Sequence, residues 1–153
     1  MDLVTEFPES LAGSAAGGIP IIGHMGLEVL HAERGRAVLR LPFEPNINHV
    51  GMVYAGSTFT LAEVPGGILF SGAFDVARFY PIVGDMKVRF VQPATTSLLV
   101  DARMSDAEID RVAAELDEHG KAKWVLDQEV VDYRGQVVAT TSATYFGLAW
   151  PTG

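Results

Sequence analysis

A single carboxylate stands inside one of the most apolar stretches of the chain. Glu63 is flanked by Leu61, Ala62 and Val64, within a run of small and apolar residues from 54 to 72. Apolar surroundings disfavour the charged form and should raise the pKa of this carboxyl towards neutrality. Such a group suits a general base that takes a proton from water. Taken alone, however, such a residue more often points to solvent or caps a neighbouring backbone group.

Upstream of this acid, the sequence offers backbone hydrogen-bond donors. Ala55, Gly56 and Ser57 are small enough for a ligand to approach a helix start closely. The first N–H groups of a helix have no partner within it, so they can hold a developing oxyanion, aided by the helix dipole. Asn48 and His49 precede this start in a loop of turn-forming residues. By itself, each is more often a turn residue than a ligand.

The remaining polar residues give weaker signals. Lys87 and Arg89 share one face of a predicted strand, where they would either meet phosphate groups or form a solvated surface. The histidines at 24, 31 and 119 fit no metal-binding spacing, and the chain has no cysteine. The sequence therefore predicts no metal and no cofactor.

Composition limits the class of protein. The 153 residues suit one domain, and 48% are apolar, enough for a sizeable core. A net charge of −8 argues against general nucleic-acid binding, which needs a basic face. No apolar run has the roughly 20 residues of a membrane span, and the first ten residues lack the basic start of a secretory signal. We expect a cytoplasmic protein that does not bind a membrane.

Alternating apolar residues and turn signals along the chain predict the strands and helices that must position these groups. We expect an irregular arm over 1–23, described either as mobile or as a short helix followed by a loop, and one domain over 24–153. Strands are predicted at 26–33, 36–43, 80–94, 96–105, 123–133 and 136–150, with Arg-Gly turns at 34–35 and 134–135. A long helix is predicted from 54 to about 72 and a short one over 106–118. Such an order favours an antiparallel sheet packed on one long helix, an α+β fold.

Two helix signals are specific. Ser105 followed by Glu108 is a capping-box pattern, Gly120 is a plausible end, and Ile109, Val112 and Leu116 would face inwards. In the long helix, Pro65 removes one backbone donor and crowds the turn before it, and two glycines follow. We therefore expect that helix to kink or stop just after Glu63.

Three segments resemble the PaaI-like acyl-CoA thioesterases of the hotdog fold, in which a curved antiparallel sheet wraps one long helix. These segments are the spacing Asn48-x6-Ala55-Gly56-x6-Glu63, the strand "DMKVRFVQPA" (85–94) and the closing "GQVVATTSATYFG" (135–147). The family often has His-Gly-Gly where this chain has Tyr54-Ala55-Gly56, and some members have a hydroxyl residue at the position of Val83.

The resemblance implies a role for each matching residue. Asn48 would orient the thioester or the attacking water, the Ala55 N–H would hold the thioester oxygen, and Glu63 would be the base or nucleophile. We place His49, Tyr54, Gly56, Lys87 and Arg89 among the substrate contacts. The expected ligand is an acyl-CoA-type molecule, and the expected assembly is a homodimer or a dimer of dimers with the site between subunits.

Two alternatives stay open on the same fold. One is a non-catalytic module that binds an acyl group or another small ligand. The other is a dehydratase or hydratase, which usually has a histidine at the working position. No histidine lies between residues 54 and 72, which disfavours the second alternative.

Overall fold

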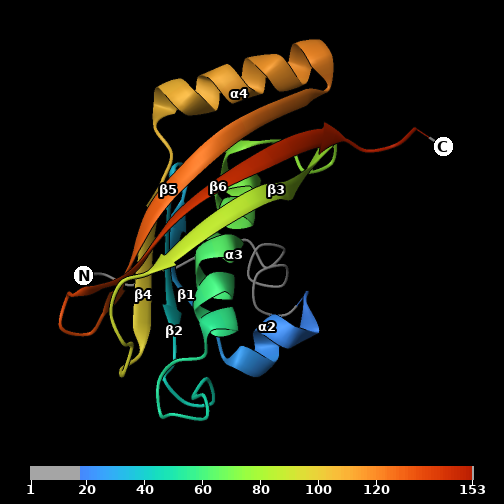
Figure 1. Cartoon of the computed structure of the whole chain (residues 1–153). Helices are drawn as coiled ribbons and strands as arrows, with labels where there is room; N and C mark the ends of the chain where they lie inside the picture. Colours follow the sequence, from blue (N-terminus) through green and yellow to red (C-terminus); the bar gives the residue numbers. More distant parts are fainter. Residues whose placement is uncertain (1–17, 153) are drawn as a thin grey trace.

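The computed structural model of the chain describes residues 18–152, in which a curved six-stranded antiparallel sheet wraps around one long helix (Figure 1). The elements are, in chain order, α2 (Pro20–Met25), β1 (Glu28–Glu33), β2 (Arg36–Leu41), α3 (Ala55–Ala73), β3 (Phe79–Phe90), β4 (Leu98–Arg103), α4 (Asp106–His119), β5 (Lys121–Asp132) and β6 (Val137–Ala149). This is the hotdog fold, and the predicted α+β class is confirmed.

The strand order in the sheet is β1-β2-β4-β5-β6-β3, with every neighbouring pair antiparallel. Strict alternation of exposed and buried residues along most of β5 directs one side of the sheet towards α3. Strand β3 is 12 residues long and pairs with β6 alone among the described residues, so its other edge is open. A long open edge of this kind is a ready place for pairing with another chain.

Helix α3 is apolar almost all round, which is typical of a helix covered on more than one side. Its inner face, including Leu61, Leu69 and Phe70, is buried against the sheet. A stripe at four-residue spacing, Ala55, Phe59, Glu63 and Gly67, is exposed or half-buried. We call this set of four residues the outer stripe of α3.

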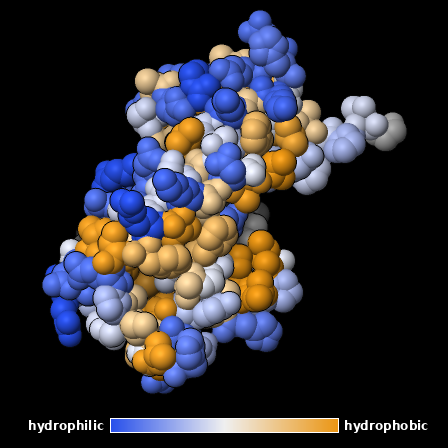
Figure 2. All heavy atoms as spheres, viewed as in Figure 1, coloured by the Kyte–Doolittle hydropathy of each residue, from blue (hydrophilic) through white to orange (hydrophobic). Residues whose placement is uncertain are grey.

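Apolar side chains also reach the surface near this helix. Phe59, Ile82, Val83 and Phe90 have between 38% and 55% of their surface exposed, although all are large and apolar. Figure 2 shows apolar residues gathered across the middle of the face on which β3 lies, below the hydrophilic α4. Large exposed patches of this kind mark surfaces that bind a partner or a ligand.

Helix α4 forms as its sequence signals predict. The Ser105 side chain accepts a hydrogen bond from the Glu108 N–H at 3.1 Å, and Gly120 ends the helix with φ of 67°. Ile109, Val112 and Leu116 are buried. The predicted cap, end and inner face are therefore all confirmed.

Some predicted boundaries are wrong. Residues 20–25 form helix α2, which starts with Pro20 at its first position and ends at Gly26 with φ of 71°, so the segment up to residue 23 is not wholly irregular. Strand β3 ends at Phe90, four residues before the prediction, and β4 is shorter at both ends. Residues 1–17 lie outside the described part, and the division between arm and domain stays a prediction.

A kink or a stop was predicted after Glu63, and the stop is wrong, because α3 continues through Pro65 to Ala73. Two side chains of the sheet donate hydrogen bonds to helix carbonyls next to the proline. Gln128 bonds to the Ala62 carbonyl and Tyr145 to the Glu63 carbonyl. These donors come from strands 66 and 82 residues away in the sequence, so they give no local signal.

Candidate active site

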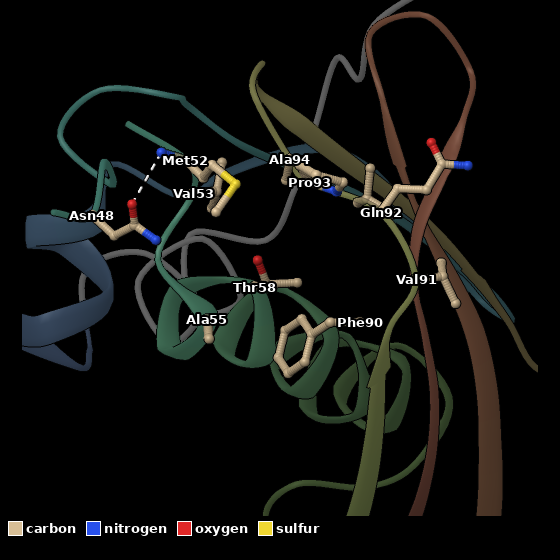
Figure 3. A pocket seen from close by; sticks show the side chains of 11 residues that line it. Asn48, Met52, Val53, Ala55, Thr58, Phe90, Val91, Gln92, Pro93 and Ala94 are labelled. Carbon is tan, nitrogen blue, oxygen red and sulfur yellow. Dashed lines mark hydrogen bonds between the residues drawn. The ribbon is translucent and has the colours of Figure 1, made fainter. Parts of the chain in front are cut away.

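A cavity of about 370 Å³ opens at the N-terminal end of α3 (Figure 3). The helix start, the loop before it and the segment after β3 form its walls. Its lining residues are Asn48, Met52, Val53, Ala55, Thr58, Phe90, Val91, Gln92, Pro93, Ala94 and Val138. We call this space the helix-start cavity. It brings together Asn48 and Ala55, two of the three predicted catalytic residues.

The side chain of Asn48 both shapes the loop and offers a donor. Its Oδ1 accepts hydrogen bonds from the N–H groups of Val50 and Met52, each at 3.0 Å. These two backbone donors fix which end of the amide is the oxygen. The amide nitrogen points the other way (Figure 3). Because that –NH₂ group lies at the cavity, Asn48 can donate to a carbonyl or a water without releasing the loop.

The start of α3 has no side-chain cap, in contrast to α4. Tyr54 is its N-cap residue and makes no capping hydrogen bond. Within residues 18–152, no group accepts a hydrogen bond from the N–H of Ala55 or of Gly56. Both donors are therefore available where the helix dipole is positive, which suits an oxyanion.

The side chain of Tyr54 explains why residue 56 is a glycine. A Cβ on Gly56 would lie 2.6 Å from the ring of Tyr54, which packs across it. Tyr54 itself is 57% exposed and does not line the helix-start cavity. Gly56 thus lets a large ring lie over the first turn of α3.

Glu63 lies in a different cavity, of about 270 Å³, which is lined by the part of α3 from Glu63 to Ser71. The lining residues are mostly aliphatic and come from α2, α3 and β3: Ile19, Ile22, Glu63, Val64, Gly67, Ile68, Ser71 and Pro81. We call this space the Glu63 cavity. Burial among these residues raises the pKa of the Glu63 carboxyl, in the direction that the sequence predicts.

One chain keeps the donors and the acid apart. Ala55 and Glu63 are eight residues apart on one helix, or about 12 Å at 1.5 Å per residue. Asn48 lies on the Ala55 side and not in the Glu63 cavity. Within a single chain, the three predicted catalytic residues therefore do not surround one reacting atom.

The remaining predicted contacts lie elsewhere. His49 is exposed in the turn after Asn48 and does not line the helix-start cavity. Lys87 and Arg89 line a shallow hollow of about 240 Å³ with Thr140, Thr141 and Ser142. Arg89 directly precedes Phe90, but alternation along β3 directs their side chains to opposite faces. The structure does not gather these three residues with the catalytic candidates.

Sequence reasoning missed several residues of the helix-start cavity. Thr58 is 3% exposed and stands one turn after Ala55. Phe90 and Gln92 come from the segment in which the prediction extended β3 to residue 94. Because Phe90 ends the strand, the chain can bend here into the wall of the cavity. The nearby Pro93 was the available signal for that early end.

The described residues hold no cluster of three or more histidine or carboxylate side chains arranged to bind a metal ion. Across residues 18–152, none of the helices combines the length and the apolarity needed to cross a bilayer.

Comparison with known proteins places the chain. A family described as a domain of unknown function, DUF4442, matches residues 13–146. The chain belongs to this family. A search of the curated proteins found no match to this chain.

Solved structures extend the comparison. A Pseudomonas aeruginosa protein of unknown function, described as a probable thioesterase, is 40% identical, with a TM-score of 0.87 over 95% of this chain and 99% of that one. A mutant of a Staphylococcus aureus thioesterase is 16% identical, with a TM-score of 0.70 over 87% and 100% of the two chains. A Streptococcus mutans protein bound to acetyl-CoA is 18% identical, with a TM-score of 0.61 over 82% and 91%. The resemblance to hotdog thioesterases is confirmed, and the two distant structures bear on the fold alone.

Proposed function

We propose that this protein hydrolyses an acyl-CoA or a similar acyl thioester to a free acid and a thiol, at a site shared between two subunits. One subunit supplies Asn48 and the Ala55 N–H, and its partner supplies Glu63. One observation carries this proposal: the oxyanion donors and the half-buried acid lie on the same helix but line two separate cavities.

A second copy of the chain would bring the two halves together. When two α3 helices pack antiparallel about a two-fold axis, the start of one lies beside the middle of the other. The apolar outer stripe of α3 and the open edge of β3 are two surfaces that such a partner would cover. The exposed Phe59 and Val83 support this, since each is a large apolar side chain left in solvent by a single chain.

The reaction needs no group beyond those named. Glu63, as a carboxylate, takes a proton from water while the water oxygen attacks the thioester carbonyl carbon. The carbonyl oxygen becomes an oxyanion, which the Ala55 N–H stabilises with the helix dipole. The amide nitrogen of Asn48 holds the carbonyl or the water in line. When the tetrahedral intermediate collapses, the C–S bond breaks and the proton held by Glu63 passes to the leaving thiolate.

The cavities and the comparisons support the proposed substrate class. Aliphatic side chains around Glu63, including Ile22 and Ile68, suit the acyl part of a thioester. A 40% identical protein is described as a probable thioesterase, and a protein of the same fold binds acetyl-CoA; both support coenzyme A as the carrier. The cytoplasmic location expected from the sequence remains a prediction.

The test is a panel of acyl-CoA thioesters of increasing acyl length, assayed for free thiol with the wild-type protein and with Glu63→Gln. The variant removes the base and keeps the shape, so hydrolysis of the best substrate should fall by at least about 100-fold. Glu118→Gln, an exposed carboxyl on α4, is the matched control and should keep full activity. Undiminished turnover by Glu63→Gln would refute the assigned role. A chain that binds the thioesters without hydrolysing them would instead be the non-catalytic binding module.

A further inference from the structure

Two side chains of the sheet donate hydrogen bonds to carbonyls of helix α3 beside its internal proline. Pro65 has no N–H to give to the Leu61 carbonyl, and its ring crowds the preceding turn. The next carbonyl along the helix, that of Ala62, accepts a hydrogen bond from Gln128 Nε2 at 2.6 Å. Gln128 is only 6% exposed, so this bond runs through the core and not through water.

A second donor reaches the backbone of the proposed base itself. The Tyr145 hydroxyl donates to the Glu63 carbonyl at 2.6 Å. A Cβ on Gly66 would lie 2.1 Å from the Tyr145 ring, so glycine at this position lets the phenol enter the helix surface. Burial, and after it the nearby Glu63 carboxylate, raise the pKa of Tyr145 far above its usual value, while the Gly66 N–H acts in the opposite direction. The hydroxyl therefore keeps its proton and remains a donor at any working pH.

The Tyr145 ring is held firmly in place. It is 1% exposed and stacks on Trp124, with ring centroids 5.5 Å apart and planes 11° apart. Trp124 in turn stacks on Phe70 of α3, with centroids 5.6 Å apart. Such aromatic contacts are short-ranged and directional. Packed on Trp124 and against the backbone at Gly66, the ring gives its hydroxyl a defined position against the helix.

We propose that Tyr145 is a positioning residue for Glu63: its hydroxyl, supported by Gln128, fixes the turn of α3 from which the Glu63 carboxylate leaves the helix. This inference rests on the proposed hydrolysis of thioesters. A base displaced by about 1 Å loses much of its effect, on the order of 100-fold. The hydrogen bond thus has a catalytic consequence beyond its contribution to folding.

The surroundings of Glu63 make this role measurable. Among residues 18–152, the other residues of the Glu63 cavity are Ile19, Ile22, Val64, Gly67, Ile68, Ser71 and Pro81, none of which titrates. Within the described residues, Tyr145 on β6 is the titratable group whose pKa the Glu63 carboxylate raises, and its hydroxyl stays neutral. The pKa of Glu63 therefore reports mainly how far its carboxyl is withdrawn from water. If the turn loosens, the carboxyl gains water and its pKa falls towards the usual glutamate value.

The experiment uses Tyr145→Phe, which removes the hydroxyl and keeps the ring. The Glu63 carboxyl is titrated by ¹³C NMR in the full chain labelled at glutamate, with Glu63→Gln used to assign its signal. Thioester hydrolysis is measured in parallel. We expect a lower Glu63 pKa, a kcat reduced about tenfold or more with an unchanged KM, and an acid limb of kcat displaced to lower pH.

Two control variants separate positioning from stability. Tyr133→Phe removes a phenol hydroxyl that bonds to Arg40 at 3.0 Å, away from both cavities. Ile109→Val trims a buried side chain of α4 and should lower the melting temperature. Neither control should shift the Glu63 titration or the pH limb.

The outcomes are distinct. A Glu63 pKa that stays at its wild-type value in Tyr145→Phe, or moves equally in Ile109→Val, overturns the proposal. If the wild-type chain hydrolyses no thioester, the proposed function fails, yet the NMR titration still decides whether Tyr145 positions Glu63. Should Tyr145→Phe not fold, Gln128→Met removes the supporting donor at similar volume. It should lower the Glu63 pKa in the same direction by a smaller amount, and an unchanged value in that folded variant overturns the proposal.

Discussion

A site shared between subunits makes a quantitative prediction about mixed dimers. Two variants are unfolded and refolded together: Glu63→Gln, which removes the base, and Asn48→Asp, which removes the amide donor. The structure favours Asp over Ala at residue 48 because a carboxylate oxygen can still accept from the N–H groups of Val50 and Met52. The loop is then kept while the –NH₂ group facing the cavity is lost.

The expected recovery follows from the geometry. Ala55 and Glu63 are about 12 Å apart along α3, whereas a thioester needs donor and base within about 3 Å of its own atoms or of one water. In a mixed dimer, one site would receive both defects and the other would receive neither. Random pairing gives half mixed dimers with one intact site each, so roughly a quarter of wild-type activity should return.

The assay is thiol release, with mixed dimers counted by native mass spectrometry. Refolding Glu63→Gln together with Glu63→Ala is the control, because both sites of that mixed dimer lack the base and no activity should appear. A site built within one chain would stay defective in every combination of Asn48→Asp with Glu63→Gln. Mixed dimers without recovered activity would therefore refute the shared site.

Three further predictions concern acid–base behaviour and stability. Burial raises the pKa of Glu63, and the base works in its deprotonated form. The value of kcat should therefore rise with pH through a limb whose midpoint lies above the usual glutamate pKa. A midpoint near pH 4 in the wild-type protein would contradict this. Because a raised native pKa means that the folded state binds more protons than the unfolded one, this carboxyl lowers stability as pH rises from about 4. Glu63→Gln should accordingly melt higher than wild type at neutral pH, by about 2–4 °C for each kcal/mol regained, with the difference closing near pH 4 in calorimetry. Ser105→Ala should lower the free energy of unfolding by about 1 kcal/mol through loss of the α4 cap and leave kcat unchanged, whereas an unchanged urea midpoint would contradict the capping role.

Local signals predicted most of the fold. Period-two alternation located all six strands, and the turn glycines Gly35 and Gly135 have positive φ values of 83° and 79°. Helix α4 follows its cap and its end residue. Each of these features depends on residues within a few positions of one another, which is why a single sequence reveals them.

The errors have non-local causes or concern short signals. Helix α2 has a proline at its first position and Gly26 after its last, a known pairing of start and end residues, but the helix itself is only six residues long. Pro65 predicted a break in α3, yet the helix continues, and two carbonyls beside the proline accept hydrogen bonds from side chains of β5 and β6. Tyr145 belongs to the closing segment that carries the resemblance, yet nothing in its local sequence indicates a bond to a residue 82 positions earlier.

The candidate site was predicted unevenly for a related reason. The resemblance to the PaaI-like thioesterases, carried by the spacing along one loop and one helix, implies the roles of Asn48, Ala55 and Glu63. By contrast, Lys87 and Arg89 were selected for their charge alone, and the structure gives them a separate hollow beside β6. Charge identifies what a side chain can bind, but the sheet decides which face it occupies.

The position of Glu63 also limits how strong a base it can be. A fully exposed carboxylate would have its usual pKa and would draw protons from water weakly, whereas a fully buried one would be protonated at neutral pH and could accept none. Half-burial in one chain lies between these limits. A partner that covers the outer stripe of α3 would withdraw more water and raise the pKa further. The N–H groups at the start of the partner's α3 would stabilise the Glu63 carboxylate and so oppose that rise in pKa. The same contact that completes the proposed site would therefore also set the pH at which it works.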